Sequence, residues 1–366
     1  MATKICIMGG GNGAFAAAAD LSLRGFQITI YVNESHKSSI EDIMKTGIIH
    51  VVGVGPVGDA KIHKVTCDLA DALSDVDIIM PILPANAQEN MAKSLLPYIK
   101  SGDKIVLTPG STGGALIFAK VLHDNGKIDG VKIAEMHTLP YATRKINSCT
   151  IDILLMCKMM FFAAFPAKHN QEMYDIVKEM YPLIELVADV LETGLNNGNA
   201  VSHPAPVILN AGKIEYYGKH YHYREGITPS VAKVNEKIDE ERLEISKVFG
   251  YKAINARERL YRMGYCPMKE TLFESYQAST TVFLPIEGPN DLNGRYLTED
   301  VPCSLVAMVE VARLAGVSTP VMDSVVILAS TLKSENYLES GRTLEKMGLN
   351  GMTIDEIKDL LQNGYR

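Results

Sequence analysis

Apolar residues in the first half of the chain gather in short runs that end at glycine or proline. Five of these runs lie at residues 4–8, 26–32, 77–84, 104–111 and 133–136. Stretches with helical character follow two of them, at residues 15–23 and 87–98. Buried strands that alternate with helices are typical of a parallel sheet covered by helices on its faces. The first half is therefore predicted to be an α/β domain with a mainly parallel sheet.

Two more stretches of the first half have strand character. Residues 51–65 alternate glycines with β-branched residues, and we expect extra strands there. Residues 151–167 form the most apolar stretch of the chain, but Asp152 and Lys158 interrupt it. Because the stretch is also shorter than the roughly 20 apolar residues of a membrane span, it is predicted to be buried sheet.

The pattern changes at about residue 171, where apolar residues begin to recur at helical spacing. Three clear helical segments lie at residues 236–249, 304–315 and 321–332. This half is predicted to be an all-helical domain. We place the boundary between residues 1–190 and residues 191–366, close to a junction rich in Asn and Gly at residues 194–201.

Composition limits the class of protein. A length of 366 residues is enough for two domains, each with its own core. The contents of 47% hydrophobic and 22% charged residues are those of an ordinary soluble globular protein. A net charge of −7 without a basic stripe argues against nucleic acid or a membrane surface as a partner. The six cysteines are scattered without a CxxC pair, and no signal peptide is evident, so we predict reduced thiols in a cytoplasmic protein.

The turn after the first apolar run carries the clearest motif. Gly9, Gly11 and Ala14 fit the pattern G-x-G-x-x-A between a predicted strand and a predicted helix. The first glycine permits a tight turn, the second lets the backbone approach a pyrophosphate, and the small third residue lets the helix pack closely on the strand. The helix N-terminus favours phosphates. An ordinary glycine-rich turn is the alternative, but the context on both sides favours a Rossmann-type dinucleotide-binding domain, with Gly9, Gly11, Asn12, Gly13 and Ala14 at the cofactor.

The end of the second predicted strand bears on the choice of cofactor. In the NAD-binding version of this fold, an acidic residue ~20 residues after the glycines binds the ribose 2′-hydroxyl. Val32 stands where that acid is expected, and Glu34 lies further along. Asn33, Ser35, His36 and Lys37 could instead receive a 2′-phosphate, although they would equally fit a polar surface loop. The cofactor is predicted to be NADP or NAD, with a slight preference for NADP.

Two loops after strands are expected to line the site, because ligands of such sheets bind outside the carboxyl ends of the strands. Pro84 ends the strand at residues 77–84, and we expect it to contact the cofactor. Residues 108–114 form a loop of small residues after the next strand, and they are predicted to form a wall of the nicotinamide and substrate site. Ser111 in this loop is a candidate substrate-binding residue.

Two segments of the second half carry candidate chemistry. His203 lies beside the predicted domain junction and is followed by prolines at positions 204 and 206. A single histidine is more often a helix cap or a packed core group. Residues 287–302 supply Arg295 and Asp300, five positions apart. Taken alone, this second segment would also fit a helix N-cap with a surface ion pair.

A third segment has the spacing of metal ligands. His220 and His222 lie two positions apart, but no third ligand is evident nearby. We therefore predict no metal site, and we interpret residues 216–223, rich in Tyr and His, as surface or as the rim of the substrate site.

The chain resembles the opine dehydrogenase family, which includes octopine and nopaline dehydrogenase-like enzymes. The resemblance rests on four pieces in the expected order, at residues 9–13, 138–144, 199–204 and 295–302. They are spread over nearly the whole chain, and the last is the most specific. The resemblance implies a catalytic pair of His203 and Asp300 at the domain interface, with Arg295 holding a substrate carboxylate. It also assigns substrate binding to Tyr141 and Thr143 of the second piece.

The reaction implied by this resemblance is the reductive condensation of an amino acid with a 2-oxo acid such as pyruvate. The amine and the ketone form an imine, which hydride from the nicotinamide reduces. His203 would relay protons because its side chain titrates near neutral pH, and Asp300 would hold its second nitrogen. Arg295 offers a planar fork that matches a carboxylate. The chain has no Trp to line a pocket for the amino-acid side chain, so the sequence does not name the amino acid.

Two other interpretations stay open. A related two-domain reductase, such as a ketopantoate reductase or a hydroxyacid dehydrogenase, would commonly use a lysine as the acid. A non-catalytic NAD(P)-sensing protein would bind the cofactor without turnover, but it would have no use for the combination of His203, Arg295 and Asp300. In every case the expected partners are small molecules, and a homodimer is left open.

Overall fold

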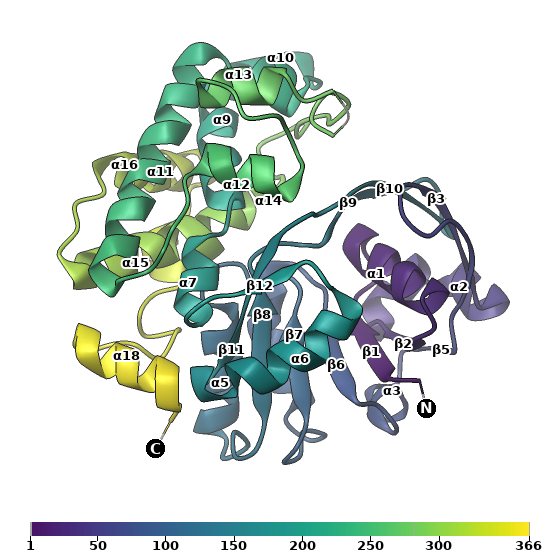
Figure 1. Ribbon diagram of the computed structural model, residues 1–366. Coiled ribbons are helices and arrows are strands. Elements are labelled where there is room, and N and C mark those ends of the chain that lie inside the picture. Colours follow the sequence, from purple (N-terminus) through teal and green to yellow (C-terminus); the bar gives the residue numbers. More distant parts are fainter. Residues whose placement is uncertain (1, 281, 366) are drawn as a thin grey trace.

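The structure, a computed structural model, describes residues 2–280 and 282–365, which form an α/β part and a helical part (Figure 1). The α/β part is built on an eight-stranded sheet with the order β12-β11-β8-β7-β6-β1-β2-β5. Its strands are β1 (Lys4–Met8), β2 (Gln27–Tyr31), β5 (Lys64–Thr66), β6 (Ile78–Pro81), β7 (Lys104–Leu107), β8 (Lys132–Met136), β11 (Met160–Phe165) and β12 (Ile184–Leu186). Neighbouring strands are parallel except for β8 and β11, which confirms the predicted mainly parallel sheet.

The carboxyl ends of the central strands meet at one edge of this sheet. These strands are short runs of mostly buried apolar residues, as expected for strands covered on both faces. The N–H of Gly9 donates to the carbonyl of Tyr31 at 2.9 Å, and the N–H of Ile82 donates to the carbonyl of Met8 at 2.9 Å. The loops after β1, β2 and β6 therefore lie side by side, where sheets of this kind bind ligands.

Among the described residues, six α-helices precede β12 and belong to the α/β part. They are α1 (Asn12–Leu23), α2 (Glu41–Thr46), α3 (Leu69–Leu73), α4 (Gln88–Leu95), α5 (Gly114–Asp124) and α6 (Asn170–Met180). The α1 helix contains four consecutive alanines that are fully buried. Their small side chains let sheets approach the helix on two sides, because α1 packs against β1 and β2 and also against a second sheet.

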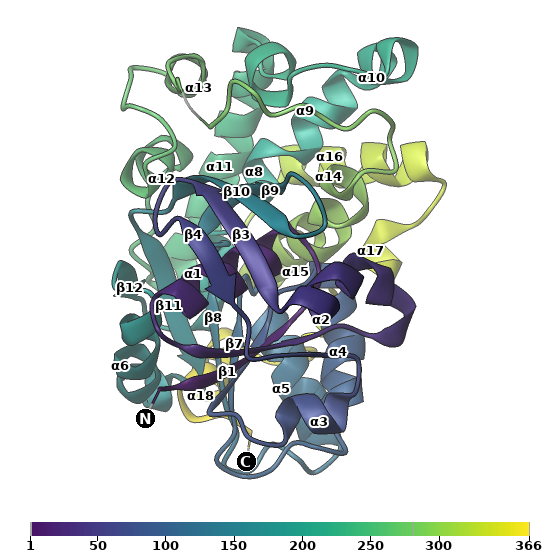
Figure 2. The ribbon, with the colours of Figure 1, turned by 90° about the vertical axis from the view of Figure 1, so that its right-hand side faces the viewer.

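That second sheet has four strands in the order β4-β3-β10-β9 (Figure 2). Its strands are β3 (Ile48–Gly53), β4 (Gly58–Lys61), β9 (Tyr141–Lys145) and β10 (Thr150–Met156). The predictions of extra strands at residues 51–65 and of sheet at residues 151–167 are confirmed. The second stretch is divided between the two sheets. In β10, which belongs to the four-stranded sheet, alternate residues are buried, whereas in β11, which belongs to the eight-stranded sheet, every residue is buried.

The remaining chain is helical, as predicted. Its helices are α7 (Val190–Leu195), α8 (Asn199–Ser202), α9 (Pro204–Leu209), α10 (Ala211–Tyr217), α11 (Pro229–Phe249), α12 (Ala256–Met263), α13 (Leu272–Gln277), α14 (Arg295–Thr298), α15 (Val306–Ala315), α16 (Pro320–Lys333), α17 (Tyr337–Ser340) and α18 (Ile354–Asn363). The α11 helix lies at the centre, in contact with α8, α9, α15 and α16. Two π-helical turns, at His222–Gly226 and Val301–Leu305, interrupt this part.

The last helix returns to the α/β part. The ammonium of Lys168 donates to the carbonyl of Asn363 at 2.7 Å, and the ring of Tyr365 stacks on His123 with 4.0 Å between centroids. Figure 1 shows α18 beside α5 and β11. The boundary at residue 190 separates the α/β elements from the later helices along the chain, but the last helix lies with the α/β part. As a domain boundary, residue 190 stays a prediction.

All six cysteines are free thiols, as the sequence predicts. None of the helices that the structure describes is long and apolar enough to cross a membrane.

Candidate active site

The glycine loop has the geometry that a dinucleotide pyrophosphate needs. Gly9 has φ +144°, and a Cβ on it would lie 2.3 Å from the carbonyl oxygen of Ile82, so only glycine fits there. Gly11 is the N-cap of α1, and nothing lies within 4 Å of a Cβ built on it. Among the described residues, no side chain caps the first turn of α1. Its N–H groups therefore remain available to a phosphate.

A lysine that the sequence analysis did not identify lies over this loop. Lys145, at the end of β9, donates its backbone N–H to the side-chain oxygen of Asn12 at 3.0 Å and its ammonium to the carbonyl of Ser39 at 3.1 Å. The ammonium also lies 3.5 Å from the ring centroid of Phe15. No acidic side chain in the described part of the chain pairs with it, so a positive charge is left over for an anion at the glycine loop.

The loop after β2 lies beside the glycine loop, as the cofactor prediction requires. A Cβ on Gly10 would lie 2.3 Å from the hydroxyl oxygen of Ser39 in this loop. The side-chain oxygen of Asn33 accepts hydrogen bonds from the N–H of Ser35 at 3.0 Å and from its hydroxyl at 2.8 Å. Val32 is buried, with 4% of its surface exposed, and its side chain lies close to Gly10 at the base of the loop.

The loops after β6 and β7 lie on the other side of the glycine loop from the loop after β2, where they form a second wall of the site. Pro84 begins a short 3₁₀ turn at Ala85–Ala87. Ser111 is buried and has a left-handed backbone conformation with φ +60°, which is uncommon outside glycine. The hydroxyl of Thr112 donates to the carbonyl of Gly194 at 3.0 Å, so this loop contacts the start of the helical part. The roles predicted for Pro84 and Ser111 fit these positions and stay predictions.

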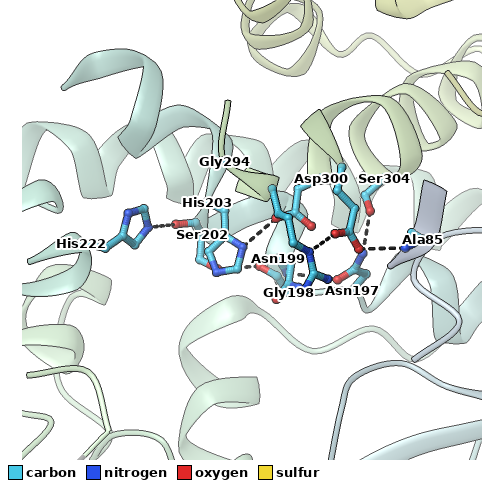
Figure 3. Close-up of polar contacts among 12 residues, drawn as sticks. Ala85, Asn197, Gly198, Asn199, Ser202, His203, His222, Gly294, Asp300 and Ser304 are labelled. Carbon is cyan, nitrogen blue, oxygen red and sulfur yellow. Dashed lines mark hydrogen bonds and ion pairs between the residues drawn. The ribbon is translucent and has the colours of Figure 1, made fainter. Parts of the chain in front are cut away.

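His203 and Asp300 lie together in the helical part, although 97 positions separate them (Figure 3). The Nδ1 atom of His203 lies 2.8 Å from a carboxylate oxygen of Asp300, and its Nε2 atom lies 2.9 Å from the hydroxyl of Tyr223. The ring of Tyr296 stacks on the imidazole with 3.8 Å between centroids. His203 stands between α8 and α9, where Pro204 starts the second helix, so the local chain direction fixes the ring at this junction.

The environment of the pair favours its uncharged forms. Burial, followed by the positive charge of Arg295, lowers the pKa of His203 to about 3. Burial, followed by the negative charge of Glu299, raises the pKa of Asp300 well above its usual range. Both shifts arise because the charged group loses hydration in the interior. One proton shared between Nδ1 of His203 and the carboxylate of Asp300 makes the pair neutral overall. The pair can therefore hold one exchangeable proton.

Arg295 lies in the same segment but is bound to Glu299. Its Nε–H donates to one carboxylate oxygen of Glu299, and the other oxygen accepts the N–H of Ala85 at 2.9 Å. The side chain of Arg295 is 68% exposed. Its terminal nitrogens make no hydrogen bond among the described residues, so they are free to meet a carboxylate.

Tyr141 and Thr143 are not brought to this group. The hydroxyl of Tyr141 donates to the carboxylate of Asp20 in α1 at 2.7 Å, and the hydroxyl of Thr143 donates to the carbonyl of Asp152 at 2.7 Å. Both side chains are buried beside α1. This geometry favours a structural role for both residues in place of the predicted substrate contacts.

The interpretation of residues 216–223 holds only in part. Tyr216 and Tyr217 are exposed, but the surface interpretation is wrong for His222 and Tyr223, which are buried beside His203. The reason is the π-helical turn at His222–Gly226, which turns the chain inward and which the sequence pattern does not reveal. No group of three or more His, Cys, Asp or Glu side chains in the described part of the chain could hold a metal ion.

Several known proteins resemble this chain in sequence or in fold, over nearly the whole length of both chains. A family model described as the alpha-helical domain of NAD/NADP octopine/nopaline dehydrogenase matches residues 186–333. Opine dehydrogenase of Arthrobacter sp. (strain 1C) is 35% identical over 356 residues, which cover 97% of this chain and 98% of that protein. Octopine dehydrogenase with NADH and L-arginine superposes with a TM-score of 0.79 at 18% identity, over 100% of this chain and 99% of the other. Yersinopine dehydrogenase with NADP⁺ superposes with a TM-score of 0.72 at 16% identity, over 99% and 98% of the two chains. The chain therefore belongs to the opine dehydrogenase family.

Proposed function

We propose that the chain is an NAD(P)H-dependent oxidoreductase that condenses an amino acid with a 2-oxo acid, such as pyruvate, and reduces the resulting imine. The observation that carries this proposal is the buried pair of His203 and Asp300, 2.8 Å apart, in a chain that also offers an open glycine loop. Two solved structures of one relative support it, since octopine dehydrogenase has been solved with NADH and L-arginine and also with NADH and pyruvate.

The glycine loop and the pair of His203 and Asp300 have separate roles in this reaction. The glycine loop and the N-terminus of α1 hold the cofactor phosphates, with Lys145 adding a positive charge beside them. Bound there, the reduced nicotinamide supplies the hydride. The amine attacks the ketone to give a carbinolamine, which must lose water to become the imine, and this step needs an acid. His203 supplies the proton, and Asp300 holds its Nδ1 side and shares a proton with it.

Arg295 binds a substrate carboxylate in this proposal. Its terminal nitrogens present parallel N–H groups that a carboxylate accepts in pairs. Glu299 holds the Nε side of the same guanidinium and also binds the N–H of Ala85, next to Pro84. This arrangement fixes the clamp relative to the cofactor side of the site. A fixed position matters because a small displacement of the reacting carbon costs rate.

Both NADPH and NADH fit the proposal, and we retain the slight preference for NADPH. Asn33 and Ser35 offer neutral hydrogen-bonding groups in the loop after β2, and Val32 stands where NAD-specific members of the fold carry an acid. Relatives of both kinds exist, since the solved octopine dehydrogenase contains NADH and the solved yersinopine dehydrogenase contains NADP⁺. A homodimer and a cytoplasmic location also remain proposals, and the molecular mass in solution would test the first.

The deciding experiment is a matrix of amino acids against 2-oxo acids, with NADH and NADPH oxidation followed separately. The same assay with His203→Ala should show a fall in kcat on the order of 10²–10⁴-fold. His50→Ala on β3 is the control, because this exposed histidine pairs with Asp59 in the second sheet and should leave the rate unchanged. A near-normal rate in His203→Ala would indicate a lysine acid, as in ketopantoate reductases or hydroxyacid dehydrogenases. Cofactor binding without turnover for any pair would indicate a sensing protein.

A further inference from the structure

The hydroxyl of Tyr223 occupies the catalytic side of His203. Since Nδ1 of His203 faces Asp300, Nε2 is the nitrogen that remains for a substrate. The Tyr223 hydroxyl lies 2.9 Å from that Nε2 atom. A substrate group and this hydroxyl cannot both bind Nε2, so either Tyr223 moves away or the proton passes through it.

The packing of Tyr223 opposes movement. Only 6% of its surface is exposed. Its ring centroid lies 4.1 Å from that of Phe283, 4.7 Å from that of His222 and 5.5 Å from that of Tyr276. The π-helical turn that carries Tyr223 is tied to the helix junction, because the Nε2–H of His222 donates to the carbonyl of Ser202 at 3.0 Å, as Figure 3 shows. Close packing of this kind leaves the hydroxyl a fixed partner of His203.

Two further rings crowd the imidazole. The ring of Tyr296 covers one face of His203 at 3.8 Å, nearly parallel to it. The ring of His222 stands on edge to it at 5.6 Å. A proton that leaves or enters Nε2 therefore passes through the oxygen of Tyr223. Burial raises the pKa of Tyr223 well above its usual value, so the hydroxyl stays protonated and remains a donor at every working pH.

We propose that Tyr223 is a catalytic residue that exchanges the proton with the substrate, while His203 and Asp300 supply it from behind. This inference rests on the proposed function. In the dehydration step, the C–O bond of the carbinolamine breaks and the oxygen leaves as water with the Tyr223 proton. The nitrogen lone pair forms the C=N bond. The proton on Nε2 of His203 moves to the oxygen of Tyr223, and Nδ1–H of the neutral imidazole donates to the Asp300 carboxylate.

Tyr223→Phe tests the relay because it removes one oxygen and keeps the ring. We expect kcat to fall on the order of 10²-fold while the KM of the cofactor stays within about twofold. In both protonation states of Nε2 the hydroxyl can hydrogen-bond to it, as acceptor from Nε2–H or as donor to the free nitrogen. Its loss should therefore change the titration of the His203–Asp300 pair, and the pH–rate profile of the reductive reaction should shift. Tyr276→Phe is the matched control, since the ring of Tyr276 packs on Tyr223 and Phe283, and among the described residues no hydrogen bond joins its hydroxyl to His203.

A double-mutant cycle separates the relay from a packing role. In a His203→Ala background, Tyr223→Phe should cost nothing further, because both residues serve one proton path. A packing role would cost the same factor in both backgrounds and would overturn the relay, even if Tyr223→Phe destabilises the protein. An equal loss in Tyr276→Phe, or an unchanged rate and pH profile in Tyr223→Phe, would also overturn it. Inactivity of the wild type with every substrate pair would instead refute the proposed function itself.

Discussion

Asn33 lies where the loop after β2 turns beside the glycine loop, and it offers the sharpest test of cofactor choice. In Asn33→Asp the carboxylate can still accept both hydrogen bonds from Ser35, and its second oxygen is free to bind a ribose diol. It would also repel a 2′-phosphate. We expect the ratio of kcat/KM for NADH to that for NADPH to rise at least about tenfold. Steady-state kinetics with each cofactor measures the ratio.

Val32→Asp is the control for that prediction. Only 4% of Val32 is exposed, so a carboxylate there would be buried without a partner. This variant should lose thermal stability without a selective gain for NADH. If Asn33→Asp left the ratio of the two cofactors unchanged, the loop after β2 would not set the preference.

Arg295→Lys tests the carboxylate clamp. An ammonium keeps the charge but cannot form two parallel hydrogen bonds, so the KM of one carboxylate substrate should rise about tenfold. A loop-shaping role through Glu299 predicts a lower melting temperature and an unchanged KM for both substrates. Glu299→Gln is the comparison, because it can still accept the N–H of Ala85 while the ion pair is lost. Identical kinetic effects of the two variants would refute the clamp.

For single residues, the sequence predicts those whose roles depend on local motifs. The glycines of the first turn follow from spacing, and His203 and Asp300 follow from the family resemblance. Lys145 could not be predicted, nor could the contact of Tyr223 with His203. Lys145 acts on a loop more than 130 positions away, and its place depends on how β9 packs over α1. Tyr223 depends on a π-helical turn, which has no recognisable sequence pattern.

Among the elements, β8, α5 and α7 meet at one buried carboxyl group. Glu135 of β8 accepts the N–H of Ala115 at 2.9 Å and is hydrogen-bonded to the hydroxyl of Thr193. That hydroxyl also lies 2.8 Å from the carbonyl of Val190. A protonated Glu135 completes this chain, because its O–H donates to Thr193, whose hydroxyl then donates to Val190. Burial raises the pKa of Glu135 to about 7, which fits the protonated form.

Glu135 should make stability depend on pH. Its pKa is about 4.3 in an unfolded chain and about 7 in the folded protein, so the folded state binds the proton more tightly. The contribution to stability is fully present below about pH 4.3 and is lost as pH rises through about 7. Glu135→Gln keeps both hydrogen bonds without titrating. The difference in unfolding free energy between the two proteins should therefore change by on the order of 2–4 kcal/mol from pH 4.5 to pH 8. A constant difference across this range would show that Glu135 does not titrate.

Element prediction succeeds where burial and pattern agree. The five apolar runs correspond to β1, β2, β6, β7 and β8, because each is covered on both faces and needs continuous apolar residues. The sequence does not reveal β12, a strand of three residues at Ile184–Leu186, because so short a segment carries no period. It also does not show that β10 and β11 belong to different sheets, since that follows from packing against α1 and α5.

In the whole molecule, Arg342 joins the helical part to the edge of the large sheet. Its backbone N–H donates to the carbonyl of Pro302, close to Asp300 along the chain. Its guanidinium donates to the carbonyl of Thr112 at 2.8 Å and to that of Ala85 at 2.7 Å. These two acceptors lie in the loops after β7 and β6, and Arg342 is only 3% exposed. One buried side chain thus holds the two loops that line the site against the segment that carries the catalytic carboxylate.

Arg342→Met should loosen this junction, because methionine fills similar space but donates no hydrogen bond. The carbonyl of Thr112 loses the guanidinium, and that of Ala85 keeps only the N–H of Gln88. We expect the melting temperature to fall on the order of 5–10 °C, with KM values rising for cofactor and substrates together since both loops lose their anchor. Arg313→Met is the matched control. The Arg313 side chain is 48% exposed, and its ion pairs with Glu310 and Asp323 are of the surface kind that contributes little. An unchanged melting temperature in Arg342→Met, with a higher KM for one carboxylate substrate alone, would instead identify Arg342 as a substrate-binding residue.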